Sequence, residues 1–257
     1  MTTNYNIFNP AFDEILLHVS WASSILDIDF YLAGAVARDY HLSKDKDYRP
    51  SRRTADIDIA VMVSNEDEFC ALKNKLIETG DFEQHTEPIK LIYKNSIELD
   101  LLPFGDIEKL GITYLTKPKS FILDVPGFSI LNKSAQQISW NGKIKTKVCT
   151  LQGIVLLKLV AYDDRPQRTK DLLDIQLIIK LYFDTLSEDV YEHHFDLMSK
   201  YEPNNNKNYI QQVCAHVIGR KIKLILKDDT NLLERVIKIL QRDRDHFWEN
   251  LLAGLIE

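Results

Sequence analysis

Two aspartates separated by one residue, Asp56 and Asp58, lie at the start of an apolar, strand-like run. Side chains alternate across a strand, so both carboxylates are expected on the same face. A third aspartate, Asp100, interrupts a second strand-like run over residues 97–102. Three carboxylates at one sheet edge repel each other unless cations neutralise them, and such clusters hold hard divalent ions, above all Mg²⁺ with phosphate as a further ligand. The pattern therefore favours phosphoryl or nucleotidyl transfer.

A turn of small residues precedes the paired aspartates and begins with Gly34 and Ala35. Backbone N–H groups in such a turn can cradle phosphate, especially at the start of a helix. Alone, Gly34 is equally typical of an ordinary strand-to-helix turn. Arg38, one helical turn further on, could reach phosphate or pair with Asp39 or Asp56.

Composition limits the classes of protein that this chain can be. It has 257 residues, 45% of them hydrophobic and 27% charged, which suits one large globular domain or two small ones. The formal net charge of −6 argues against binding bulk nucleic acid through a basic surface. Three widely spaced cysteines suggest a reducing compartment, and no apolar run reaches membrane-spanning length. We expect a cytoplasmic protein without a membrane partner.

The hydrophobic pattern predicts an α+β fold in two parts: an α/β domain over residues 1–149 and a helical domain over residues 150–257. Helical periodicity covers residues 12–26, and a helix is expected from about residue 65 to 79 with Ser64 as its N-cap. Two hairpins are expected, around residues 94–96 and around Asn141-Gly142. Helical segments are predicted over 172–183 and 209–226, with a further apolar stripe between 232 and 240.

Taken in order, these motifs resemble the nucleotidyltransferase superfamily and are most similar to the AbiEii/MenT-type toxins. The resemblance rests on the Gly34 turn, the Asp56-Ile57-Asp58 pair and Asp100 with the following Leu-Leu-Pro-Phe-Gly. It continues through the lysine-bearing helix around Lys158 and the Lys-Asp segment at Asp171, and it covers about residues 31–175. The expected fold is a mixed β-sheet with flanking helices, followed by helices.

The resemblance implies a role for each motif. Asp56, Asp58 and Asp100 would bind two Mg²⁺ ions, and Asp100 could also accept the proton of the attacking hydroxyl. Nucleotide binding is implied for Gly34 and Ala35 through their N–H groups, for Lys158 through its ammonium, and for Arg38. Asp171 would orient Lys158, although such an aspartate more often simply pairs with neighbouring basic residues.

The implied activity is transfer of a nucleoside monophosphate from an NTP to an acceptor. The AbiEii-like resemblance implies RNA, such as tRNA, as acceptor and a cognate antitoxin as partner in a toxin–antitoxin or phage-defence pair. Two alternatives stay open. The acceptor could be a small molecule such as an aminoglycoside, or the fold could be a non-catalytic nucleotide-binding module. The second alternative is suggested by Ala35, where the superfamily usually has glycine or serine.

Overall fold

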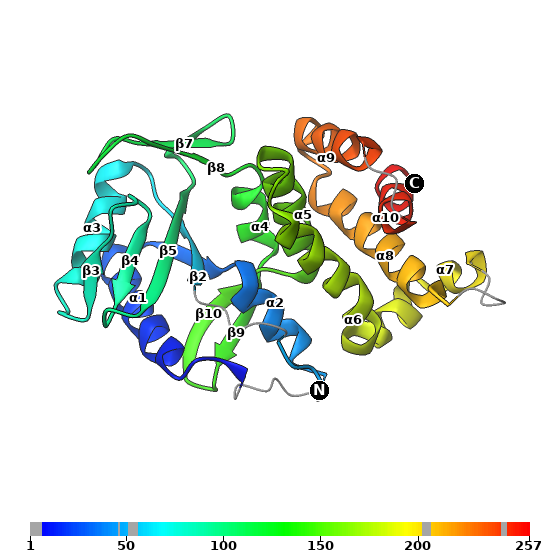
Figure 1. Ribbon diagram of the computed structural model, residues 1–257, viewed down its shortest axis with the longest axis horizontal. Coiled ribbons are helices and arrows are strands. Elements are labelled where there is room, and N and C mark those ends of the chain that lie inside the picture. Colours follow the sequence, from blue (N-terminus) through cyan, green and yellow to red (C-terminus); the bar gives the residue numbers. More distant parts are fainter. Residues whose placement is uncertain (1–6, 46, 51–55, 202–206, 243–245) are drawn as a thin grey trace. The chain divides into compact units, whose positions relative to one another are not determined.

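The computed structural model describes residues 7–45, 47–50, 56–201, 207–242 and 246–257 (Figure 1). Internal contacts divide the chain into two compact units, Thr2–Thr150 and Leu151–Glu257. The first unit contains all the strands of the described residues and four of the helices, whereas the second is helical. A mixed α+β fold followed by a helical region is therefore confirmed.

A seven-stranded mixed sheet forms the centre of the α/β unit, in the order β3-β4-β5-β2-β1-β10-β9. Strand β2 pairs in parallel with β5 and antiparallel with β1, while β1 pairs in parallel with β10. The strands are β1 (Asp29–Leu32), β2 (Asp56–Met62), β3 (Phe82–Gln84), β4 (Lys90–Tyr93), β5 (Ile97–Phe104), β9 (Gln136–Trp140) and β10 (Ile144–Val148).

Both predicted hairpins are confirmed. Strands β4 and β5 pair antiparallel around the turn at residues 94–96, and β9 pairs with β10 across Asn141-Gly142. Asn141 and Gly142 have φ angles of 49° and 69°, the positive values that a tight two-residue hairpin turn requires.

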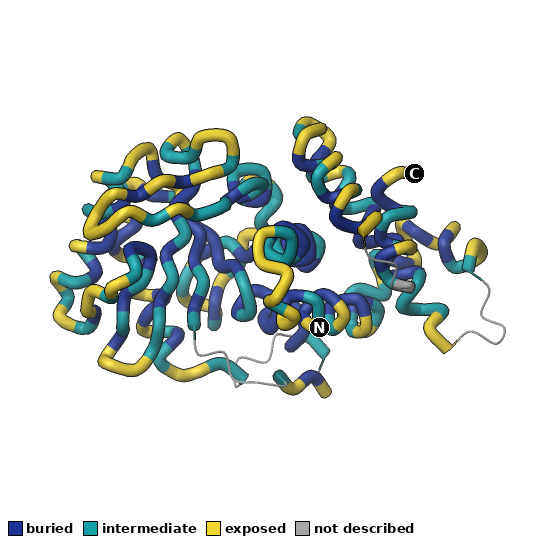
Figure 2. The backbone as a smooth tube through the Cα atoms, turned by 45° about the horizontal axis from the view of Figure 1, so that its top comes forward, coloured by how far each residue is buried: buried dark blue, intermediate teal, exposed yellow. Residues whose placement is uncertain are grey.

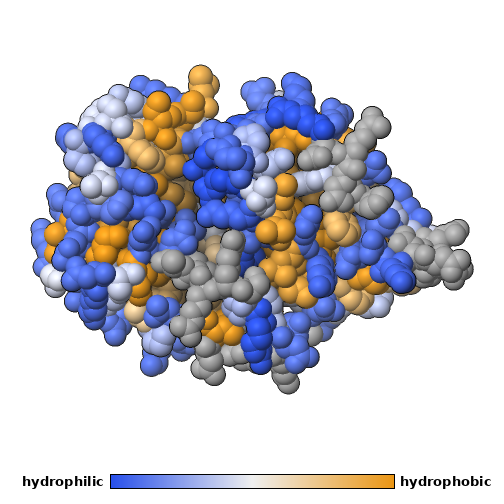
Figure 3. Space-filling view, viewed as in Figure 1, coloured by the Kyte–Doolittle hydropathy of each residue, from blue (hydrophilic) through white to orange (hydrophobic). Residues whose placement is uncertain are grey.

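A second, three-stranded antiparallel sheet was not predicted. It consists of β6 (Glu108–Lys109), β7 (Ile112–Leu115) and β8 (Phe121–Asp124). Its strands are short, and its outer face carries the exposed side chains of Ile112, Tyr114 and Ile122. Figure 3 shows hydrophobic side chains over this sheet, near the top of the view. Because apolar residues face both sides, the sequence lacks the alternation that identifies a half-buried strand.

Four helices accompany the sheets: α1 (Ala11–Leu26), α2 (Gly34–Leu42), α3 (Glu66–Ile77) and α4 (Phe128–Ser134). The first agrees closely with the predicted helix, and its apolar face is buried. The expected N-cap of α3 is wrong by one residue, because the side chain of Asn65, not Ser64, accepts the Glu68 N–H at 3.0 Å. The Glu68 carboxylate in turn accepts the N–H of Ser64, the residue that precedes the N-cap.

The described residues of the second unit form six helices: α5 (Leu151–Asp164), α6 (Thr169–His193), α7 (Phe195–Lys200), α8 (Tyr209–Ile225), α9 (Thr230–Arg242) and α10 (His246–Ile256). Gly219 of α8 and Gly254 of α10 allow a close helix crossing, since an added Cβ on either would lie 2.1 Å from a carbonyl oxygen of the other helix. Within the part of the chain that is described, the helices are too short or too polar to span a membrane.

Burial follows the sheet. Figure 2 shows the central strands mostly dark blue and the connecting loops largely yellow. Strands β2 and β5 alternate, with Ile57, Ile59, Leu99 and Leu101 buried on one face and the acidic residues only partly buried on the other. Cys149 and Cys214 are buried free thiols, and Cys70 is a partly buried one.

Candidate active site

The three predicted carboxylates occupy two neighbouring strands. Asp56 and Asp58 belong to β2, and Asp100 belongs to β5. In the parallel pairing of these strands, Asp58 is in register with Asp100. Residues in register on paired strands point to the same side of a sheet, so the three side chains share one face.

A fourth carboxylate and a lysine join this face, and neither was predicted as a site residue. Glu98 is in register with Asp56, and Lys90 of β4 is in register with Asp100 from the other side. The Lys90 ammonium lies 2.6 Å from a Glu98 carboxylate oxygen and 3.4 Å from Asp100 Oδ1. Because the strand order is β4-β5-β2, Lys90 approaches Asp100 from the side opposite Asp58.

The sequence contained a signal for the positions of both Glu98 and Lys90. Glu98-Leu99-Asp100 repeats the spacing of Asp56-Ile57-Asp58, and extending the predicted hairpin register back from its turn places Lys90 opposite Asp100.

The surroundings of Asp100 shift the pKa of its carboxyl group strongly. Burial raises the pKa of Asp100 to about 7, the negative charge of Asp58 adds to the rise, and Lys90 opposes it. Only 13% of its side chain is exposed. Among the described residues, none donates a hydrogen bond to its buried Oδ1. A buried carboxylate oxygen without a donor is costly, and this one is therefore available as a ligand.

Gly34 brings a helix N-terminus against these carboxylates. The Ala33 N–H donates to the Asp58 carbonyl at 3.0 Å, and α2 begins at the next residue. Gly34 has a φ of +56°, and a Cβ added there would lie 2.0 Å from Asp58 Oδ2. Only glycine fits this approach. Gly34 and Ala35 are partly exposed, and Ala33 supplies no side-chain cap, so the first N–H groups of α2 can serve a ligand.

Arg38 is held inside the α/β unit by its neighbour. Its guanidinium lies 2.7 Å from the Asp39 carboxylate, and both residues are buried. The Tyr48 hydroxyl also donates to Asp39, at 2.6 Å. Pairing with Asp39, one of the contacts that the sequence left open for Arg38, is observed.

The acidic face suits Mg²⁺ in part. Among the residues that the structure describes, no three His, Cys, Asp or Glu side chains converge on one preformed ion position. Mg²⁺ does not require such a cage, because it is usually bound by one or two carboxylates together with water and substrate phosphates. The Asp100 oxygen, which has only the 3.4 Å ion pair with Lys90 among the described residues, and the amide-bearing turn at Gly34 provide both kinds of contact.

Lys158 and Asp171 lie in the helical unit, where they form a buried charge cluster. The Lys158 ammonium lies 3.0 Å from Asp171 and 2.6 Å from Asp174, with side-chain exposures of 14%, 2% and 7% for the three residues. Arg168 approaches the other oxygen of Asp171 at 3.4 Å. Asp171 therefore orients Lys158 from α6, together with an aspartate one helical turn later.

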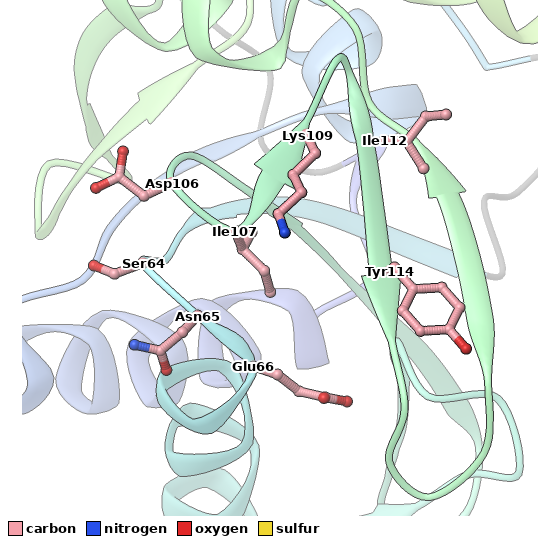
Figure 4. Close-up of a pocket in the computed structure, with 8 residues that line it drawn as sticks. All are labelled: Ser64, Asn65, Glu66, Asp106, Ile107, Lys109, Ile112 and Tyr114. Atoms are coloured by element: carbon pink, nitrogen blue, oxygen red, sulfur yellow. The ribbon is translucent and has the colours of Figure 1, made fainter.

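A pocket of about 560 Å³ lies at the opposite end of β2 from the aspartates (Figure 4). It follows the last residues of β2 and β5, where Asn65 begins α3 and Asp106 lies in the next loop. Ile107 and Lys109 point into the space beside the small sheet. None of the predicted site residues lines it.

Comparison with known proteins gives structural likeness only. No family model matches the sequence, and no curated protein matches it. The antibiotic-resistance factor ANT(2'')-Ia aligns with a TM-score of 0.37 and 15% identity, over 75% of this chain and 94% of its own. The lincosamide antibiotic adenylyltransferase LnuA, in its lincomycin-bound structure, gives 0.37 and 14%, over 68% and 96%.

The Thermotoga maritima CCA-adding enzyme, complexed with tRNA, gives a TM-score of 0.28 and 11% identity, over 96% of this chain and 79% of its own. All three TM-scores are below 0.5. We therefore base the functional proposal on the geometry of this chain's own residues.

Proposed function

We propose that this protein is a Mg²⁺-dependent nucleotidyltransferase, which moves a nucleoside monophosphate from an NTP to an acceptor hydroxyl or phosphate. The observation that carries the proposal is the register of Asp58 with Asp100 on parallel strands, with Gly34 packed against the Asp58 carboxylate. This arrangement combines carboxylates for a metal with backbone amides for phosphate at one sheet edge.

In this proposal Asp56, Asp58 and Asp100 hold two Mg²⁺ ions. When bound, the ions would polarise the reacting phosphate and neutralise charge on the leaving pyrophosphate. Asp100 would also take the proton of the acceptor hydroxyl, because it lies in register with Asp58 on the face proposed for the reacting phosphate. Its buried, donor-free oxygen is not committed to another hydrogen bond.

The phosphates of the nucleotide would be bound by chain elements of two kinds. The N–H groups of Gly34 and Ala35 begin α2, where the helix dipole also favours negative charge. A phosphate role for Lys158 is implied by the motif resemblance alone, and its ammonium pairs with Asp171. Arg38 would act indirectly, by fixing α2 through Asp39.

Two acceptor classes are consistent with this site. The AbiEii/MenT-like motifs favour RNA, with tRNA as a candidate and an antitoxin as a partner. A cationic small molecule such as an aminoglycoside is favoured by a different observation: Glu98 adds a fourth carboxylate to the same sheet face. We place RNA first because the motif resemblance spans both units of the chain.

The test is to incubate the purified protein with each α-labelled NTP and Mg²⁺, in the presence of total RNA or of a panel of aminoglycosides. Label should enter one acceptor class, and Asp58→Asn should abolish the transfer. Asp67→Asn is a matched control. Asp67 is an exposed carboxylate on α3, and it pairs with Lys117. Tight NTP binding by calorimetry without label transfer would instead indicate the non-catalytic module, and transfer that survives Asp58→Asn would refute the site.

A further inference from the structure

The lysine on the acidic face is positioned differently toward its two carboxylate partners. Lys90 forms a hydrogen-bonded ion pair with Glu98 at 2.6 Å. Its distance to Asp100 Oδ1 is 3.4 Å, and that oxygen receives no hydrogen bond from any described residue. The ammonium is thus hydrogen-bonded to Glu98 and lies beside Asp100 at a longer ion-pair distance.

This arrangement is informative because Lys90 could satisfy Asp100 by a small movement. Its side chain is only 16% exposed, and both carboxylates lie within salt-bridge distance. A full ion pair with Asp100 would cover an oxygen that the proposed function assigns to a metal ion. Glu98 lies closer to the ammonium than Asp100 does, so its negative charge draws Lys90 away from Asp100.

We propose that Lys90 and Glu98 together set the metal affinity of the site, a conclusion that rests on the proposed function. Lys90 is an internal cation that competes with a divalent ion for Asp100 and offsets part of the acidic charge. Glu98 retains Lys90 and keeps the Asp100 oxygen open. The pair therefore regulates the site without contributing a group that touches the nucleotide.

The proposal predicts opposite effects for the two partners. Lys90→Met removes the competing charge, so Mn²⁺, used alone as the probe, should bind about threefold to tenfold more tightly. Glu98→Gln leaves Asp100 as the anionic partner of Lys90, so Mn²⁺ should bind about tenfold more weakly. Lys94→Met is the matched control: it removes the same charge from the same hairpin, but its lysine pairs with Glu14.

Binding is measured on the full chain by electron paramagnetic resonance of free Mn²⁺, with circular dichroism and thermal unfolding in EDTA to verify that each variant is folded. The double variant Lys90→Met/Glu98→Gln separates the mechanism from simple charge removal. If Glu98 acts through Lys90, the loss caused by Glu98→Gln should largely disappear once Lys90 is absent. Lys90→Arg should retain an affinity near that of the unmodified protein.

The proposal is overturned if Lys90→Met binds Mn²⁺ no more tightly than the Lys94→Met control, or if the Glu98→Gln loss persists in full in the double variant. Either result would leave the proposed enzyme activity standing. Conversely, the expected order of affinities in a protein that transfers no label would support the regulatory pair and refute the enzyme. Absence of Mn²⁺ binding by the unmodified chain would refute both.

Discussion

Replacing Gly34 by alanine tests the geometry on which the site depends. The new Cβ would lie 2.0 Å from Asp58 Oδ2, whereas real Cβ contacts are essentially never shorter than 3.0 Å. The carboxylate must therefore retreat by about 1 Å, and a displacement of that size in a reacting group costs about 10²-fold in rate. The left-handed backbone, with φ at +56°, adds about 1–2 kcal/mol of strain for any residue with a Cβ.

The two contributions can be separated with a second glycine. Gly80 has a φ of +81°, and a Cβ added there would meet nothing within 4 Å. Gly80→Ala should therefore show the strain alone, as a lowering of the melting temperature by about 2–4 °C for each kcal/mol. Gly34→Ala should show a loss of that size or larger and, in addition, a loss of Mn²⁺ binding and nucleotidyl transfer.

Thermal unfolding, Mn²⁺ binding and label transfer are measured on both variants and on the unmodified protein. The expected result is that Gly80→Ala retains full Mn²⁺ affinity while Gly34→Ala loses at least tenfold. If both variants bind Mn²⁺ equally well, the close packing of Gly34 against Asp58 has no functional consequence, and the reasoning is refuted.

Three further predictions concern charge. Lys158→Met leaves two buried carboxylates without their lysine partner, so it should destabilise the helical unit by about 3 kcal/mol in urea unfolding. An unchanged unfolding midpoint would contradict this. Burial lowers the pKa of His41 to about 4 from 6.5, so the folded state binds its proton less readily than the unfolded chain. The α/β unit should then lose up to about 3 kcal/mol as pH falls through that window, and His41→Gln should flatten the dependence. Hydrogen bonds from Arg220 and then His216 lower the pKa of Glu257 to about 2 from 4.5. The fall in stability as pH drops between these values should therefore be smaller in Glu257→Gln than in the unmodified chain, as measured by thermal unfolding.

Much of the fold could be predicted from local signals. The hairpins followed from their turn residues, and α1 followed from its apolar periodicity. The small sheet formed by β6, β7 and β8 could not be predicted in the same way, because its strands are short and place large apolar residues on an exposed face. Helix α6 extends beyond its predicted range at both ends, since the flanking polar residues are compatible with a helix without showing a stripe.

The candidate site was predictable where a motif lies within one strand or turn. The face shared by Asp56 and Asp58 follows from strand alternation alone. The pairing of β2 with β5 is a long-range contact, so local sequence could not predict the register of Asp58 with Asp100. Lys90 was missed because its importance depends on three strands together, and the choice of Arg38 for Asp39 depends on burial that local sequence does not report.

The alternation of β5 links the alignment of the acidic residues to folding itself. Leu99 and Leu101 are completely buried, and Asp100 stands between them on the reverse side. A shift of β5 by a single position would expose both leucines and bury the aspartate, and both changes would lower the stability of the fold. Burial of the leucines thus fixes the strand register that places the acidic residues side by side. A requirement for stability alone is then enough to maintain their spacing.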